Sequence, residues 1–329
     1  MSKMPSKTIQ GVDLLKFILS IMIIAAHTNL LGEYGTLAKF REILTSIAVP
    51  MFFAISSFFF YRKIESTSKG ESPLPILKKS VVRLTILFGS WYMMMLPMTY
   101  ICFFSIATWK EVVFALLFSC CFTGYWFIKA LLINTLLIYL FRKSKALLMF
   151  SFVALIINLY CSYNYIYHFN IKLFDFHPYY SFYYHMAYFC LGALFAKYQN
   201  AFNFSKRHKT LLIVIWSTLF IMTFSYKTGP ILRLLSFPLL FPIFLHLNLT
   251  PNPKYRTMRD MSIILYMVQF ILIRLYNGAC HAFLHKSSYL LQIFQFSIVR
   301  FIIVLLTALG VAILIIRYET RYKLLKYLH

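Results

Sequence analysis

Acidic side chains are rare in this sequence. Its 329 residues include nine Asp and Glu against 33 Lys and Arg, which gives a formal net charge of +24 at pH 7. Charged residues of all kinds make up 13% of the chain, whereas apolar residues make up 60%. Such a composition excludes an ordinary water-soluble domain and is typical of a protein built from membrane-spanning helices.

Several patterns that would indicate other classes of protein are also missing. The six cysteines show no spacing typical of metal ligands, and a thiol in an apolar run behaves as a small hydrophobic group. We therefore expect neither a metal site nor a structural disulfide. No internal repeat supports an inverted-repeat transporter. Because no nucleic-acid-binding motif accompanies the basic residues, we expect them to contact lipid headgroups rather than nucleic acid.

Long apolar runs, by contrast, recur along the whole chain. Ten of them are long enough, or nearly so, to cross the hydrocarbon core of a bilayer. They cover residues 12–31, 43–61, 84–105, 126–141, 147–162, 182–197, 211–225, 231–247, 262–276 and 299–317. The sequence thus predicts an all-α, polytopic integral membrane protein with about ten transmembrane helices. We expect residues 1–329 to form a single membrane domain, with 62–83 as a flexible cytoplasmic loop and no fused extracytoplasmic domain.

The positions of the basic residues test this number of spans. With ten spans, the loops on the side of the two termini hold 22 Lys and Arg residues, and the loops on the other side hold six. Cytoplasmic loops carry an excess of Lys and Arg. The distribution therefore predicts that both termini lie in the cytoplasm.

The first apolar segment carries a line of polar residues. At about 100° per residue, Lys16 and His27 return to within roughly 20° of each other on a helix. Asp13 and Ser20 fall within about 60° of the same line. Asp13 is also the only carboxylate inside a predicted span. Ionisable residues in membrane helices usually face the bundle interior or a wet cavity, so this line, called the stripe below, is a candidate site.

Each residue of the stripe also has a structural interpretation. Lys16 can extend its ammonium group to the membrane surface, and His27 can bond to a neighbouring helix. Asp13 and Lys16, three residues apart, can form an ion pair that only lowers the cost of insertion. We favour a functional interpretation because the residues are aligned on one side of an otherwise apolar helix.

The spacing of the stripe matches one kind of chemistry. On the predicted topology Asp13 and Lys16 lie near the cytoplasmic face and His27 lies toward the outer leaflet, with a rise of roughly 16 Å between Lys16 and His27. That rise is comparable to the length of an extended pantetheine arm. A histidine can take a proton near neutral pH, as acyl transfer to a hydroxyl requires. Asp13 would orient its neighbours or neutralise Lys16.

Further cations are candidates for contacts with phosphate or with a developing oxyanion. Lys78, Lys79 and Arg83 precede the third span, and Arg83 is the one that starts a helix. Orientation of the chain in the membrane is a sufficient alternative explanation for all three. Four more cations lie inside predicted spans, and the sequence gives no basis for choosing among them. They are Lys129, Arg233, Arg274 and Arg300.

At these residues the chain resembles the acyltransferase-3 family of membrane acyltransferases. Asp13, Leu15, Lys16 and His27 fit the family pattern D-x-L-(R/K)-x10-H in the first helix. Later segments are similar to further family motifs in the same order. They are VPMFFAISSFFFYRK (49–63), KKSVVRLTILF (78–88), YWFIKAL (125–131) and SIILYMVQ (262–269). The resemblance implies that His27 is the catalytic histidine, that Lys16 is its partner cation, and that Arg83 contacts coenzyme A or the active site.

Three positions depart from the family pattern. Ser57 stands where glycine is usual, Ile86 stands near an expected proline, and Gln269 replaces a frequent late histidine. An amide can form hydrogen bonds but cannot carry a proton at neutral pH. If the late histidine has a chemical role in the family, this chain has altered or lost it.

The resemblance implies an enzyme, an acyltransferase that transfers groups other than aminoacyl groups. We expect an inner-membrane O-acyltransferase, with cytoplasmic acetyl-coenzyme A as donor, Lys16, Lys78, Lys79 and Arg83 as its contacts, and no metal. The expected acceptor is a hydroxyl of a surface glycan or of its lipid-linked precursor, with a separate extracytoplasmic protein as a possible acyl acceptor. His27 would act as general base or as acyl carrier. The alternative is a transporter or flippase in which Asp13, Lys16 and His27 relay protons or substrate, but proton-coupled carriers usually need more carboxylates.

Overall fold

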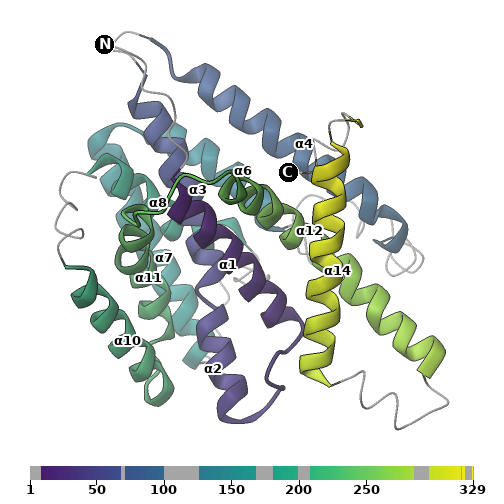
Figure 1. Ribbon diagram of the computed structural model, residues 1–329. Coiled ribbons are helices and arrows are strands. Elements are labelled where there is room, and N and C mark those ends of the chain that lie inside the picture. The colour runs from purple at the N-terminus through teal and green to yellow at the C-terminus, as the bar shows by residue number, and fades with distance from the viewer. Residues whose placement is uncertain are drawn as a thin grey trace, which may run out of the picture. The chain divides into compact units, whose positions relative to one another are not determined.

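The computed structural model of the protein describes residues 9–67, 71–99, 126–167, 181–198, 208–284, 296–319, 321–322 and 328. Within these ranges the chain is helical and contains no β-strand. The predicted all-α class is therefore confirmed for this part of the protein (Figure 1).

Each of the ten predicted apolar stretches overlaps a helix. These helices are α1 (Gln10–His27), α3 (Ala48–Glu65), α4 (Leu74–Thr99), α6 (Trp126–Leu140), α7 (Ser144–Tyr167), α8 (Phe182–Lys197), α10 (Lys209–Ser225), α11 (Gly229–Leu245), α12 (Pro253–Leu284) and α14 (Ser297–Tyr318). In the described ranges five helical stretches are long and apolar enough to cross a membrane, and α6, α10 and α11 are shorter apolar helices. The number of crossings and the side of the termini stay predictions.

One helix was not predicted. Helix α2 (Gly35–Thr45) follows a turn in which Gly32 and Gly35 have φ angles of 91° and 88°, values that suit glycine. The ring of Phe40 packs against Phe220 of α10, with 5.4 Å between the centroids. Because α2 has 11 residues and several charged side chains, it does not stand out as an apolar run.

The loop predicted at 62–83 is shorter than expected. Helix α3 continues to Glu65, and α4 already begins at Leu74. The Ser72 hydroxyl accepts a hydrogen bond from the Leu74 amide at 3.3 Å, and Pro75 lies in the first turn of α4, where a proline needs no amide donor. Lys78, Lys79 and Arg83 therefore lie on a helix and not in a loop.

The chain divides into two compact units that alternate along the sequence. The first comprises residues 1–49, 203–226 and 238–329, and the second comprises 50–202 and 227–237. In the first unit α1 packs against α12, α14 and α2 (Figure 1). The pairing of α1 with α12 is the most extensive helix contact of the described chain.

Contacts within the first unit define the directions of these helices. Asp13, early in α1, lies near Arg259 of α12, and His27, at the end of α1, contacts Phe270 further along α12. The two helices therefore run in the same direction. Arg300, at the start of α14, bonds to the chain just after α1 ends, so α14 runs in the opposite direction. These are the relative directions that alternation predicts for the first, ninth and tenth spans.

The second unit has an aromatic core. The ring of His185 on α8 stacks on Phe53 at 4.6 Å and on Trp126 at 4.8 Å between centroids. All three side chains are buried. The Asn158 side chain of α7 donates to the Tyr184 carbonyl at 2.7 Å, which ties α7 to the start of α8.

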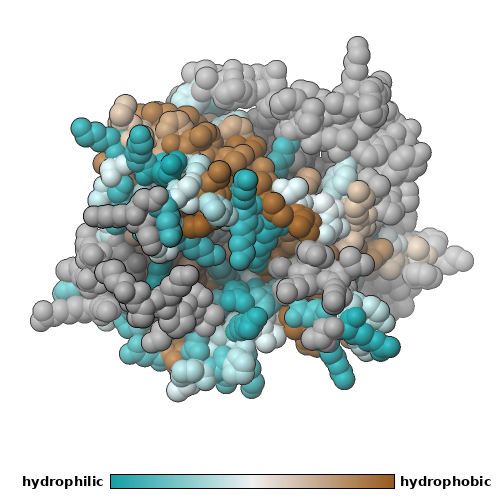
Figure 2. Space-filling model, turned by 90° about the horizontal axis from the view of Figure 1, so that it is seen from above, coloured by the Kyte–Doolittle hydropathy of each residue, from teal (hydrophilic) through white to brown (hydrophobic). Residues whose placement is uncertain are grey.

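Many large apolar side chains are open to the surroundings. On α7, Met149 and Phe152 are 72% and 65% exposed, and on α14, Leu306 is 62% exposed. Figure 2 shows hydrophobic side chains, in brown, exposed next to hydrophilic ones on the face seen from above. Such helix faces suit contact with lipid. Together with the apolar helices they indicate a multi-pass membrane protein.

Candidate active site

The stripe predicted from the sequence lies on α1 and is called the α1 stripe from here on. Asp13 and Ser20 are buried, Lys16 is half-buried, and His27 at the last turn is exposed. Because α1 is one continuous helix from Gln10 to His27, the rise of roughly 16 Å from Lys16 to His27 follows from its length. The structure therefore separates two parts of the stripe, a buried charged end and an open imidazole.

The charged end includes residues of α12 that the sequence did not single out. Asp13 is 5% exposed, and Lys16, Arg259 and Asp260 are the charged groups that act on it. Arg259 Nε pairs with Asp260 Oδ1 at 3.0 Å. One carboxylate oxygen of Asp13, Oδ2, is buried without a hydrogen-bond partner among the described residues. The nearby cations offset part of the cost of burying the carboxylate.

Arg259 and Asp260 were missed because they were assigned to a cytoplasmic loop. Helix α12 begins at Pro253, about two turns before them, and proline is favoured in the first turn of a helix. That proline is the signal in the sequence that predicts the earlier start. The earlier start brings two further charged residues onto a helix that packs against α1.

The imidazole of His27 is at the other end of α1. Its ring meets the ring of Phe270 on α12 edge to face, at 4.8 Å between centroids and an interplanar angle of 61°. Phe270 packs against the imidazole, while the residue as a whole is exposed. A histidine in this position can receive a proton from a molecule that approaches the end of the helix.

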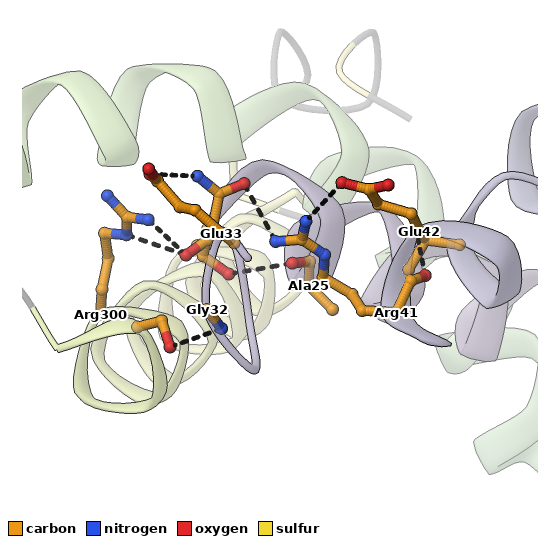
Figure 3. Close-up of polar contacts among 10 residues, drawn as sticks. Ala25, Gly32, Glu33, Arg41, Glu42 and Arg300 are labelled. Atoms are coloured by element: carbon orange, nitrogen blue, oxygen red, sulfur yellow. Dashed lines mark hydrogen bonds and ion pairs between the residues drawn. The ribbon is translucent and has the colours of Figure 1, made fainter. Parts of the chain in front are cut away.

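The chain that follows His27 is held by α14 (Figure 3). Arg300 donates two hydrogen bonds to the Thr28 carbonyl oxygen, from Nε at 2.9 Å and from Nη2 at 2.6 Å. The Ser297 hydroxyl accepts a hydrogen bond from the Gly32 amide at 3.1 Å. Arg300 is one of the four cations predicted inside spans, and it bonds to the residue that directly follows His27.

A second set of contacts ties this turn to α2. The Asn29 amide nitrogen donates to Glu33 at 2.8 Å, and its oxygen accepts from Arg41 Nη1 at 3.1 Å (Figure 3). Arg41 is 6% exposed and also pairs with Glu42 at 3.2 Å. The unexpected helix α2 therefore positions a buried arginine against the end of α1.

Gln269, the departure from the frequent late histidine, is fully buried on α12. Its nitrogen donates to the Tyr266 carbonyl at 3.0 Å, whereas its oxygen has no hydrogen-bond partner in the described ranges. An unpaired buried amide oxygen costs about 1–3 kcal/mol. The Gln269 oxygen therefore forms no hydrogen bond with His27.

Lys78, Lys79 and Arg83 are exposed on α4, in the second unit. Lys79 and Arg83 lie within electrostatic range of Lys63 at the end of α3, so three like charges gather there. The α1 stripe belongs to the first unit, and a common site for both groups stays a prediction. Across the described residues, no group of three or more His, Cys, Asp or Glu side chains is arranged to hold a metal ion.

Comparison with known proteins identifies one family. The model of an acyltransferase domain, that of the acyltransferase-3 family, matches residues 9–317. No curated protein and no solved structure matches the chain. The match runs through both compact units and includes the whole α1 stripe. It favours an enzyme over the transporter considered from the sequence. The chain belongs to the acyltransferase-3 family and is a membrane acyltransferase.

Proposed function

We propose that the protein is an O-acyltransferase of the inner membrane that transfers an acyl group, most simply acetyl, from cytoplasmic acyl-coenzyme A. The acceptor is a hydroxyl of a surface glycan or of its lipid-linked precursor. The observation that carries this proposal is the two-ended α1, with buried charges at one end and the exposed imidazole of His27 at the other.

The charged end suits the donor. Lys16 and Arg259 supply cations beside the buried Asp13, and phosphates bind preferentially to such groups. Lys78, Lys79 and Arg83 on α4 are further candidates for contacts with the nucleotide phosphates. A pantetheine arm that follows α1 from Lys16 would bring its thioester to the level of His27, because the rise between the two residues is roughly 16 Å.

The imidazole end suits the acceptor. In the proposed reaction His27 takes the proton of the acceptor hydroxyl, and the hydroxyl oxygen attacks the thioester carbonyl carbon. The carbon–sulfur bond then breaks and coenzyme A leaves as a thiolate. His27 transfers its proton to this thiolate. A route in which His27 itself carries the acyl group for one step uses the same geometry. In that case a separate extracytoplasmic protein is a second possible acceptor.

The first test compares the wild type with His27→Ala in nanodiscs. Radiolabelled acetyl-coenzyme A is followed for binding and for slow hydrolysis to free coenzyme A. We expect His27→Ala to abolish hydrolysis and to leave binding largely intact, because the variant removes the proton acceptor and no donor contact. His208→Ala is the matched control, since His208 precedes α10 and lies outside the α1 stripe.

Two results would contradict the proposal. One is a folded wild-type protein that neither binds nor hydrolyses acetyl-coenzyme A or a longer acyl-coenzyme A. The other is unchanged hydrolysis in His27→Ala, which would remove His27 from the chemistry while leaving the enzyme class intact.

A further inference from the structure

The turn after His27 has an unusual backbone. Asn29 and Leu31 have φ angles of 53° and 71°, in the left-handed region that residues other than glycine rarely adopt. Asparagine tolerates this conformation, but for a leucine it is strained. A strained backbone persists only where surrounding contacts hold it.

Arg300 supplies two of the hydrogen bonds that hold this turn. Its two donors converge on one oxygen, the carbonyl of Thr28, which directly follows His27. Hydrogen bonds from a charged donor are roughly twice as strong as those between neutral groups. The carbonyl belongs to the C-cap residue of α1, at the end of the helix that carries partial negative charge and favours a cation. Arg300 also interacts electrostatically with Tyr276 of α12, so its guanidinium lies where α1, α12 and α14 meet.

We propose that Arg300 is a positioning residue for His27. Through the Thr28 carbonyl it fixes the end of α1, and so it holds the imidazole against Phe270 in the position from which it meets the acceptor. The inference rests on the proposed function, because it assigns to Arg300 a part in the reaction of His27. The Ser297 hydroxyl also holds this turn, because it accepts a hydrogen bond from the Gly32 amide at the other end of the turn.

The expected consequence is a loss of turnover without a loss of donor binding. Misplacing a catalytic group by 1 Å can cost on the order of 100-fold in rate. The donor contacts are expected at the other end of α1, roughly 16 Å from His27, and do not depend on this turn. Arg300→Ala should therefore lower kcat by about 100-fold and leave the KM for acyl-coenzyme A unchanged.

Two measurements on the full-length protein in nanodiscs test the positioning independently of turnover. The first is deuterium uptake by the amides of residues 28–32, followed by mass spectrometry. The second is the rate at which diethyl pyrocarbonate modifies His27. We expect Arg300→Ala to raise the uptake and to change the modification rate severalfold. Arg300→Lys keeps one cationic donor and should recover part of kcat. If Arg300→Ala does not fold, Arg300→Lys and Ser297→Ala serve in its place.

Lys39→Ala is the matched control. Lys39 donates to the Phe224 carbonyl near the end of α10 at 2.6 Å, so its removal deletes a cation–carbonyl contact of the same kind in the same unit. It should change neither measurement. Unchanged deuterium uptake in Arg300→Ala would overturn the inference, and so would raised uptake with an unchanged modification rate of His27. A wild type without acyl-coenzyme A turnover would contradict the proposed function alone, since both measurements remain decisive for Arg300.

Discussion

At the scale of single residues, Lys16 belongs to the charged end of the α1 stripe. It is half-buried, and its charge acts on the buried carboxylate of Asp13 one turn earlier. The family resemblance allows either Lys or Arg at this position, which indicates that a cation is needed there rather than one particular geometry. A substitution that tests Lys16 should therefore remove its charge.

Lys16→Met should weaken donor binding, because it removes a cation from the proposed phosphate end. Hydrogen bonds to charged groups contribute about 1.5–3 kcal/mol, which corresponds to a roughly 10- to 150-fold rise in the Kd for acyl-coenzyme A. Lys16→Arg keeps the charge and should bind the donor nearly as well as the wild type. Titration of each variant with radiolabelled coenzyme A measures both effects.

Lys209→Met is a suitable control for this experiment. Lys209 donates to the His246 carbonyl at 3.2 Å at the start of α10, outside the α1 stripe. Equal affinity for coenzyme A in Lys16→Met and in the wild type would exclude Lys16 as a donor contact.

At the scale of helices, two glycines mark places where backbones meet. A methyl group added at Gly192 of α8 would overlap the Ala54 carbonyl oxygen of α3, and one added at Gly11 of α1 would overlap the Phe244 carbonyl oxygen. Backbone atoms cannot move aside as a flexible side chain can. Small residues that allow close approach are typical of helix packing in membranes.

Gly192→Ala should destabilise the protein by about 1–3 kcal/mol, the usual cost of overpacking. Gly89→Ala is the matched control, because Gly89 lies on α4 in the same unit and an added methyl group meets no atom within 4 Å. Alanine is the better helix former by about 1 kcal/mol, so this control should be neutral or stabilising. Thermal unfolding in detergent measures both. A Gly192→Ala variant as stable as Gly89→Ala would show that α3 and α8 can separate at no cost.

The sequence predicted long apolar helices well and short or charged helical segments poorly. All ten apolar stretches overlap helices, and the bounds of α8 agree to the residue with the predicted 182–197. Helix α2 and the start of α12 were missed because their charged residues interrupt the apolar pattern. A tertiary contact, that of Phe40 with Phe220, supports α2. An apolar run marks a helix that contacts lipid or the protein core, and it does not distinguish the two. It gives no signal for a short, charged helix that is stabilised by contacts with its neighbours.

The candidate site was predicted in part for the same reason. The α1 stripe could be found because it lies on a single helix, where spacing alone determines which residues share a side. Arg259 and Arg300 are brought to that stripe from other helices, which spacing within α1 does not reveal. Arg300 was recognised as a cation inside a span, but only the packing of α14 shows that it reaches the Thr28 carbonyl.

At the scale of the whole molecule, the predicted topology assigns each loop to one side of the membrane. Single cysteines introduced at Glu33 and Lys227 should react with an impermeant maleimide added outside intact cells, because both positions lie in outer loops on that topology. Ser66 and Lys143 should react only after permeabilisation. All four positions are exposed, so a difference in labelling reports the side and not burial.

The native cysteines must first be replaced in this experiment, and the background chain must retain its acyltransferase activity. If the cysteines at positions 66 and 143 were labelled from outside and those at 33 and 227 were protected, the topology would be the inverse of the predicted one. It would also put His27 on the cytoplasmic side, so the acceptor would have to be a cytoplasmic molecule.

The contact between Thr28 and Arg300 joins residues 272 positions apart in the chain. A ribosome that adds about 5–20 residues per second needs roughly 15 to 55 s to make the arginine after the threonine. During this interval the newly inserted first helix holds Asp13, Lys16 and His27 in the bilayer before α12 and α14 exist to cover them. The site is therefore among the last parts of the protein to be completed during biosynthesis, and the nascent chain is most exposed to quality control while it waits.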